Sequence, residues 1–229
     1  MRAASIAARS ILAAAFAAAL AVAAAPAPQG QVVDSIVARI EDDIITLSEL
    51  RELAAYQRLF DGRSQGNEEL RSELIEQWVV NNEATTSRFP QPAESEVNRE
   101  VGRVESSGAG SGSYQQRLAE VGLTPEAVRR IITRQIYLAR YLDYKFRSSI
   151  QVSDSAIENY YRDQLLPQLQ AKGQPAPPLT DVRDQIREVL IEQGVNERTA
   201  AWFAETKPRL KIELEPLDAS SVSRAGNQP

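Results

Sequence analysis

Histidine and cysteine are both absent from this sequence of 229 residues, and methionine occurs once. Without histidine or cysteine the chain cannot supply a Ser/His/Asp triad, a Cys/His pair, a histidine proton shuttle or an ordinary zinc site. A phosphate-binding loop of the GxxxxGK(S/T) type is also missing, so nucleotide-driven cycling is not indicated. These absences exclude most hydrolases and metalloenzymes, and the sequence predicts no cofactor.

Basic residues are fewer than acidic ones, with 26 lysines and arginines against 31 aspartates and glutamates and a net charge of −5. Nucleic-acid binding needs a cationic surface, so this balance argues against a nucleic-acid partner. Because no cysteine is present, no disulfide can form, and stability outside the cytoplasm would have to come from the hydrophobic core.

The first 25 residues have the pattern of an export signal. Arg2 and Arg9 give a positive start, and an uninterrupted apolar run of 15 residues follows at 11–25. This run is shorter than the roughly 20 strongly apolar residues that span a bilayer, so we expect cleavage near residues 23–25 and no stable membrane anchor. Cleavage would remove two arginines and no acidic residue, which changes the net charge from −5 to −7. The pattern therefore predicts a protein of the periplasm.

Residues 35–46 predict a β-hairpin that leads directly into a helix. Two β-rich segments flank an acidic turn at 41–43, as in a short hairpin. Thr46 and Glu49 have the spacing of a capping box, which marks the start of a helix. We expect this helix to run to about residue 60, before an Asp-Gly turn.

Further helices are predicted from apolar periodicity and from capping residues. The expected ranges are 67–88, 94–104, 114–121, 124–147, 153–166 and, beginning at a cap formed by Thr180, 180–207. Two segments connect them: a Gly/Ser-rich loop at 106–113 and a segment with four prolines at 167–178, both typical of connections.

Residues 209–215 alternate apolar and charged side chains, with Leu210, Ile212 and Leu214 on one side, as in a half-buried strand. A ribbon of two strands is marginal by itself, so the N-terminal hairpin and this strand each lack a partner. We therefore predict that they pair. The fold class expected is mainly α, with a small antiparallel sheet that joins the two ends of the mature chain.

Four segments carry a resemblance to a known family. They are VDSIVARIEDDIITLSEL at 33–50, GLTPEAVRRIITRQIYLARYL at 122–142, VSDSAIENYY at 152–161, and the closing helix and strand at 177–214. In this order they resemble the SurA-like periplasmic chaperones, in which a parvulin-type prolyl isomerase domain stands between the third and fourth segments. The resemblance implies a helical chaperone domain that binds unfolded exported proteins.

The chain departs from that family at the position of the isomerase domain. Only about 12 to 16 residues separate the two flanking helices, where a parvulin domain would need roughly 90, well above the minimum size of a domain. Parvulin active sites carry histidines, and this chain has none. We expect that the isomerase domain is missing and that the chain is not an enzyme.

The helix expected at 124–147 has two unlike faces. Its apolar residues fall within about 80° of one direction, while Tyr137, Tyr141 and Tyr144 fall on the opposite side. Tyrosine joins a large apolar ring to a polar tip, so an exposed stripe of tyrosines could hold extended client segments without demanding one sequence. The alternative is a second helix packed on the same face, since long helices are often buried on two sides.

Other aromatic residues divide into two groups. Tyr56 and Phe60, at the end of the first helix, are candidates for either client binding or core packing. Core packing is expected for four further aromatic residues at helical spacing, namely Trp78, Phe89, Trp202 and Phe203.

The sequence thus predicts a signal peptide at 1–25, a mainly α-helical SurA-like chaperone domain at 32–215 and a disordered tail at 216–229. Within the domain we expect an N-terminal part at 32–166, a linker at 167–178 in place of the parvulin domain, and a closing helix and strand at 179–215. The expected function is ATP-independent chaperoning of unfolded or partly folded exported proteins, outer-membrane proteins among them, by a monomer or dimer. The alternative is a non-catalytic assembly or scaffold subunit that binds one dedicated envelope partner.

Overall fold

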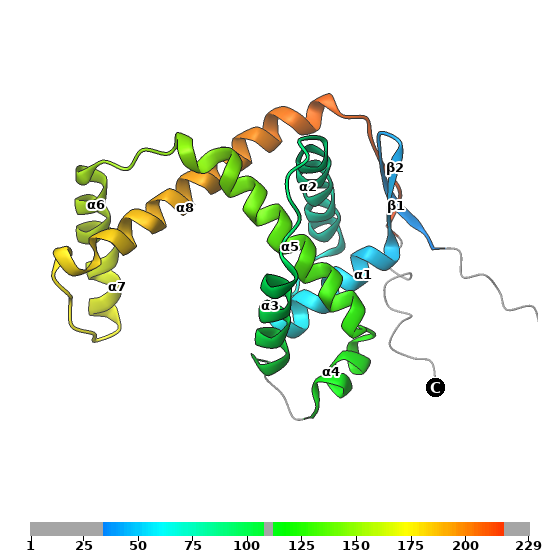
Figure 1. Ribbon diagram of the computed structural model, residues 1–229, viewed down its shortest axis with the longest axis horizontal. Helices are drawn as coiled ribbons and strands as arrows, with labels where there is room; N and C mark the ends of the chain where they lie inside the picture. Colours follow the sequence, from blue (N-terminus) through cyan, green and yellow to red (C-terminus); the bar gives the residue numbers. More distant parts are fainter. Residues whose placement is uncertain (1–33, 108–111, 218–229) are drawn as a thin grey trace, which may run out of the picture. The chain divides into compact units, whose positions relative to one another are not determined.

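A computed structural model of the chain describes residues 34–107 and 112–217 (Figure 1). The predicted signal peptide, residues 108–111 of the Gly/Ser-rich loop and the tail from residue 218 lie outside the described residues. Helices dominate the described part, and its three strands form one antiparallel sheet. The predicted fold class is therefore confirmed.

The N-terminal hairpin forms as expected and positions the first helix. Strands β1 (Ile36–Ile40) and β2 (Asp43–Thr46) pair antiparallel. Helix α1 (Leu47–Tyr56) begins at a complete capping box, in which the Thr46 hydroxyl accepts from the Glu49 amide and the Glu49 carboxylate accepts from the Thr46 amide. Such reciprocal bonds satisfy amides that the start of a helix leaves without partners.

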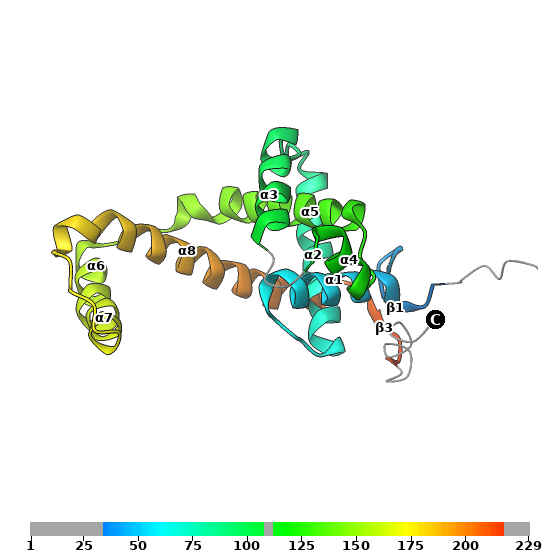
Figure 2. The same ribbon diagram turned by 90° about the horizontal axis from the view of Figure 1, so that it is seen from below.

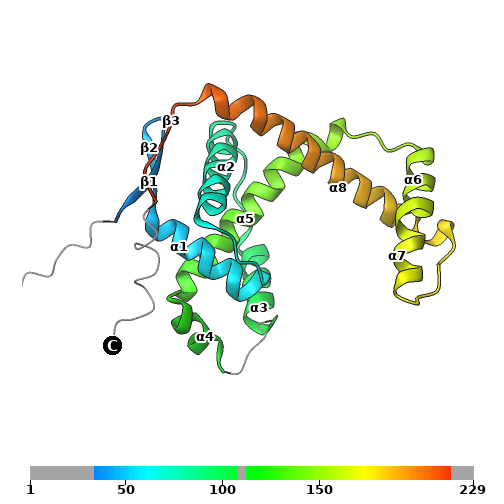
Figure 3. The same ribbon diagram turned by 180° about the vertical axis from the view of Figure 1, so that it is seen from behind.

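The C-terminal strand closes the sheet, as predicted. Strand β3 (Ile212–Leu214) pairs antiparallel with β1, with Ile40 opposite Ile212 and Ala38 opposite Leu214, so the strand order is β2-β1-β3 (Figure 3). Ile212 is half-buried against the core beneath the sheet, whereas Leu214 is exposed. The alternation predicted for this strand therefore holds at Ile212 but not at Leu214.

Arg71 on α2 (Asn67–Thr86) fastens the sheet to the helices. Its side chain is buried, and one Nη donates to the carbonyl oxygens of Glu215 at 2.7 Å and Val37 at 3.5 Å. The other Nη pairs with the carboxylate of Glu68 one turn away. A single guanidinium thus satisfies carbonyls at the end of β3 and in β1, two segments far apart in the sequence.

Helix α5 (Pro125–Phe146) is the central helix of the described residues. It begins at the predicted cap, where the Thr124 hydroxyl accepts from the Ala127 amide at 3.1 Å. Helices α1, α2 and α3 (Glu94–Ser107) pack on it, and the short α4 (Tyr114–Val121) leads into it. Its buried side chains contribute to two of the three apolar clusters of the described part.

Helix α3 continues two residues into the segment predicted as a loop. Ser106 lies in its last turn, where its hydroxyl donates to the carbonyl of Gly102 at 2.8 Å. A serine that bonds back to the preceding turn is compatible with helix. The serine-rich composition therefore gave the wrong boundary here.

The proline-rich connector is shorter than predicted. Helix α6 (Asp154–Tyr160) continues through a π-helical turn (Tyr161–Leu165) into α7 (Leu166–Ala171), whose first turn contains Pro167 (Figure 2). Proline has no amide and so removes one bond from a helix, and here it directly follows the π-helical turn, where the regular bonding pattern is already interrupted. The residues between α7 and α8 (Leu179–Thr206) are therefore only 172–178.

Helix α8 also begins earlier than predicted, with its cap two residues before Thr180. Pro178 occupies its cap position, with φ −56° and ψ 143°. Thr180 lies inside the helix, where its hydroxyl donates a hydrogen bond to the Asp181 carboxylate. The predicted cap at Thr180 is therefore wrong. Further along, Gly194 allows close packing: a Cβ there would lie 2.8 Å from Cγ2 of Ile150, in the segment that precedes α6.

Candidate functional site

The three candidate tyrosines of α5 have different environments. Tyr137 and Tyr141 are each 3% exposed, whereas Tyr144 is 70% exposed. The first two pack against Val80 and Ala84 of α2. An exposed stripe of three tyrosines is therefore not present, and for Tyr137 and Tyr141 the alternative of a second helix on that face describes the structure.

Phe89 covers the tyrosine face of α5. Its ring centroid lies 5.8 Å from that of Tyr137, 5.4 Å from that of Tyr141 and 5.3 Å from that of Tyr144. The Tyr137 hydroxyl donates to the Phe89 carbonyl at 3.4 Å. Tyr144 therefore presents its outer face to solvent while Phe89 supports it from within.

A Schellman motif at the end of α2 sets the position of Phe89. The Phe89 amide donates to the Ala84 carbonyl and the Arg88 amide to the Thr85 carbonyl, both at 2.9 Å, and Arg88 has φ 54°. These are the two bonds and the left-handed residue of that motif, which usually contains glycine. Phe89 then packs on Ala84 in the same cluster. The sequence does not indicate this turn, because arginine stands where glycine is usual.

Lys145 joins these rings to a second aromatic group on α5 and α8. Its Nζ lies 4.9 Å from the ring centroid of Trp202, 5.6 Å from that of Phe146 and 5.9 Å from that of Tyr141. Glu83 of α2 pairs with the same ammonium group. We name the whole set the aromatic cluster: Phe89, Tyr137, Tyr141, Tyr144, Phe146, Trp202 and Phe203.

Most of the aromatic cluster is only half-buried. Phe89, Phe146, Trp202 and Phe203 are partly accessible while they pack on each other or on the adjoining core. The core position predicted for Phe89, Trp202 and Phe203 is thus partial. Aromatic rings that pack on the protein with one face and expose the other face to solvent can contact apolar side chains of another molecule.

Tyr56 and Phe60 lie elsewhere, beside α3 and α4. Tyr56 is buried and Phe60 is half-buried in the π-helical turn Gln57–Asp61, with ring centroids 5.1 Å apart. Burial, with the nearby Asp61 carboxylate as the next cause, raises the pKa of Tyr56 to about 12. Core packing, one of the two readings of the sequence, describes Tyr56.

A groove between α2 and α5 forms a second accessible feature. Two pockets of about 120 and 390 Å³ share Arg134 and Asn81, and a third, of about 30 Å³, also contains Arg134. We name the three together the α2–α5 groove. Ile44, Leu74 and Trp78 line one end, and arginines of α5 line the other.

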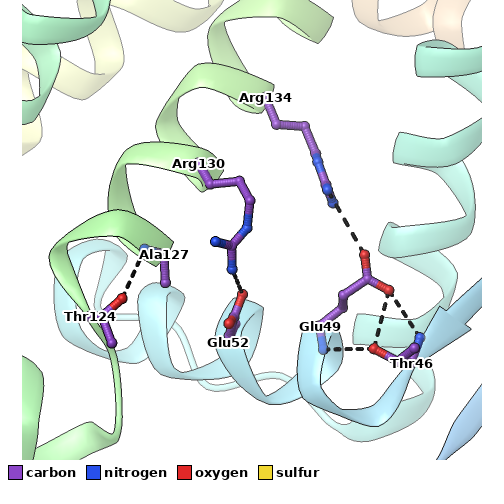
Figure 4. Close-up of polar contacts among 7 residues, drawn as sticks. All are labelled: Thr46, Glu49, Glu52, Thr124, Ala127, Arg130 and Arg134. Atoms are coloured by element: carbon purple, nitrogen blue, oxygen red, sulfur yellow. Dashed lines mark hydrogen bonds and ion pairs between the residues drawn. The ribbon is translucent and has the colours of Figure 1, made fainter. Parts of the chain in front are cut away.

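The arginines of the groove differ in how well they are paired (Figure 4). Arg130 donates to Glu52 of α1 at 2.6 Å, and Arg129 donates to Asn98 at 2.6 Å and Glu94 at 3.1 Å. Arg134 lies 3.9 Å from Oε1 of Glu49, beyond hydrogen-bond distance. The other oxygen of that carboxylate, Oε2, serves the capping box.

Chaperone SurA from Ralstonia nicotianae is similar to this chain. The two share 28% identity over 149 residues, which are 62% of this chain and 30% of the relative. No protein-family model matches the chain. The chain thus spans about 30% of the length of the curated relative that it matches. The comparison supports a SurA-like relationship.

In residues 34–107 and 112–217, no helix combines the length and the apolar character needed to cross a bilayer.

Proposed function

We propose that this chain is an ATP-independent chaperone of the periplasm that binds unfolded or partly folded exported proteins, including outer-membrane proteins, without isomerase activity. The observation that carries the proposal is the similarity to a chaperone of the SurA type in a chain with a half-open aromatic cluster. The predicted export signal supports the assignment to the periplasm.

Binding at the aromatic cluster would be passive. An apolar client side chain that settles on Tyr144 and its supporting rings removes apolar area from water, at roughly 25 cal/mol per Å² before the cost of ordering the client. Aromatic faces accept many side chains with little demand on sequence. Contacts of this kind are individually weak and exchangeable, which suits a protein that holds its clients until they fold.

The absence of isomerase activity has two supports. Only residues 172–178 lie between α7 and α8, and a segment of that length is far below the size of a domain, about 50 residues at the least. The sequence contains no histidine, which a parvulin active site uses. We infer that the connector 172–178 occupies the place at which the SurA-like family carries its isomerase domain.

The test is suppression of aggregation. An outer-membrane protein unfolded in urea is diluted into buffer without ATP, and light scattering is followed with and without a near-equimolar amount of this protein. We expect suppression by the wild type and a weaker effect of Tyr144→Ser. Tyr160→Ser, which removes a half-buried tyrosine of α6 outside the aromatic cluster, is the matched control. Scattering that the wild type leaves unchanged would contradict the proposal.

Two further measurements separate the alternatives. Turnover of a prolyl peptide should remain at the background rate, and a rate above it would contradict the absence of isomerase activity. Capture from an envelope extract should yield many unrelated unfolded proteins. A single partner recovered in stoichiometric amount would instead favour the assembly or scaffold subunit.

A further inference from the structure

The geometry points to Arg134 as a binding site for an acidic side chain of the bound client, and this inference rests on the proposed chaperone function. We propose that the α2–α5 groove takes an extended polypeptide segment in which a glutamate or aspartate neighbours an apolar residue. The carboxylate would pair with the guanidinium of Arg134, and the apolar side chain would lie against Ile44 and Trp78.

The first support is the unused hydrogen-bonding capacity of Arg134. A guanidinium carries five N–H donors and no acceptor. Among the described residues, Arg134 donates no hydrogen bond, and its nearest carboxylate oxygen, on Glu49, is 3.9 Å away. Glu49 is held in place by its bonds to the Thr46 amide and hydroxyl through Oε2, so approach to Arg134 would disturb the cap of α1.

The neighbouring arginines show that this state is particular to Arg134. Arg130 and Arg129 each have a partner at 2.6 Å. A client carboxylate that bound either would have to compete with Glu52 or Asn98. At Arg134 it would compete with a distant ion pair only, and a carboxylate can accept two parallel bonds from a guanidinium.

The second support is the surroundings of Arg134. Its side chain is 39% exposed, so it is reachable from solvent and yet partly shielded. Ile44, which is 49% exposed, and the half-buried Trp78 lie at the adjacent end of the groove. The Trp78 Nε1 donates to Asp43 at 2.9 Å, which leaves the indole ring for apolar contact. Shielding of this kind strengthens a charge-assisted hydrogen bond.

The arrangement of the pockets around Arg134 favours an acidic side chain over a chain terminus. Arg134 lines all three pockets of the groove, and the two larger ones lie toward Ile44 and Trp78 on one side and toward Arg129 on the other. An internal acidic residue would let the client fill the groove in both directions. A terminal carboxylate at Arg134 would leave one side empty, so the geometry favours the internal residue.

The experiment uses three labelled peptides that share an extended, aromatic-containing sequence. The first has a central glutamate and the second a central glutamine, both with blocked termini. The third has the glutamine and a free terminal carboxylate. Binding is measured by fluorescence anisotropy to the full protein as the wild type, Arg134→Gln, Arg134→Lys and Arg187→Gln. Arg187 of α8 is the matched control, because its side chain is 40% exposed and pairs with Asp184 outside the groove.

We expect the wild type and Arg187→Gln to bind the glutamate peptide about tenfold more tightly than the glutamine peptide, the size expected for a charge-assisted pair. Arg134→Gln should lose this preference and bind the glutamine peptide as the wild type does. Arg134→Lys should retain only part of it, because lysine lacks the two parallel donors. The unfolding temperature of Arg134→Gln should equal that of the wild type, since a distant exposed ion pair contributes little.

Several results would overturn the inference. Equal affinity of the wild type for the glutamate and glutamine peptides would overturn it while leaving the proposed function intact. A preference for the peptide with the free terminal carboxylate would show that Arg134 binds a chain end, which contradicts binding of an internal acidic residue. If Arg134→Gln and Arg187→Gln lost the preference for the glutamate peptide equally, the preference would come from the net charge of the protein and not from Arg134. If the wild type bound none of the peptides, the proposed function would fail together with the inference.

Discussion

Replacing Arg71 with methionine should loosen the junction between the two ends of the fold. Methionine preserves most of the apolar stem but removes the guanidinium that bonds the Glu215 carbonyl at 2.7 Å and the Val37 carbonyl at 3.5 Å. A hydrogen bond from a charged group contributes about 1.5–3 kcal/mol, and the Val37 carbonyl keeps the Glu215 amide as a partner. The longer bond and the exposed partner Glu68 add little. We therefore expect the free energy of unfolding to fall by about 2–3 kcal/mol.

Equilibrium urea unfolding, followed by far-UV circular dichroism, measures this change. Arg187→Met is the control, since it breaks a surface pair within α8 that should contribute about 0–1 kcal/mol. Hydrogen exchange adds a local readout, because the Glu215 amide donates to the Val37 carbonyl at 3.2 Å and should lose protection in Arg71→Met. A loss of stability no larger than in Arg187→Met, with protection of Glu215 unchanged, would refute the reasoning.

Two further predictions concern packing and pH. Gly102→Ala in α3, where a Cβ meets open space, should raise the free energy of unfolding by about 1 kcal/mol. Gly194→Ala, whose Cβ would lie 2.8 Å from Ile150, should lower it by about 1 kcal/mol in the same urea assay. Equal shifts in the two variants would contradict the close packing at Gly194. The hydrogen bond from Arg147 lowers the pKa of Glu188 below its ordinary 4.5. The pair therefore stabilises the fold fully above pH 4.5, and this contribution is lost as the pH falls through the lowered pKa of Glu188. The difference in melting temperature between the wild type and Glu188→Gln should accordingly be small, largest near neutral pH and smaller in acid, and a difference that grows on acidification would contradict it.

Local signals in the sequence were sufficient for most of the fold. The capping box at Thr46 and the Thr124 cap mark the starts of α1 and α5 because their bonds involve residues only three positions apart. Pairing of β3 with β1 followed from a counting argument, since neither a lone strand nor a lone hairpin is stable. The two helix starts depend on neighbouring residues alone, whereas the pairing of β1 with β3 is a distant contact that the sequence predicts only because each piece lacks a partner.

The features that the sequence did not predict depend on distant contacts or on uncommon residues at familiar positions. Arg88 occupies a left-handed position that glycine usually takes. No residue in the sequence therefore indicates the turn that places Phe89 over the tyrosines of α5. Burial of Tyr137 and Tyr141 is a consequence of that turn and of α2. The prolines at 167–178 predict a connector from Pro167 onward, whereas α6 continues through a π-helical turn into α7, and nothing local in the sequence indicates this continuation.

The lack of a hydrogen-bond partner for Arg134 among the described residues is another feature that depends on distant contacts. Its special position arises because Glu49 is engaged in a helix cap and because Arg130 has taken Glu52. Sequence alone presents the arginines of α5 as equivalent charges on an exposed face. Their distances to the carboxylates of α1 distinguish Arg130 from Arg134 (Figure 4).

Site-specific crosslinking tests most directly whether this chain holds unfolded proteins at its aromatic cluster. A photo-reactive phenylalanine analogue is placed at Tyr144 in one variant and, as a control, at Arg162, whose side chain is 64% exposed outside the cluster. Irradiation with an unfolded outer-membrane protein should give a crosslinked product from position 144, little from position 162, and none from either once the client has folded. Equal yields at the two positions, or no product at 144, would contradict the account.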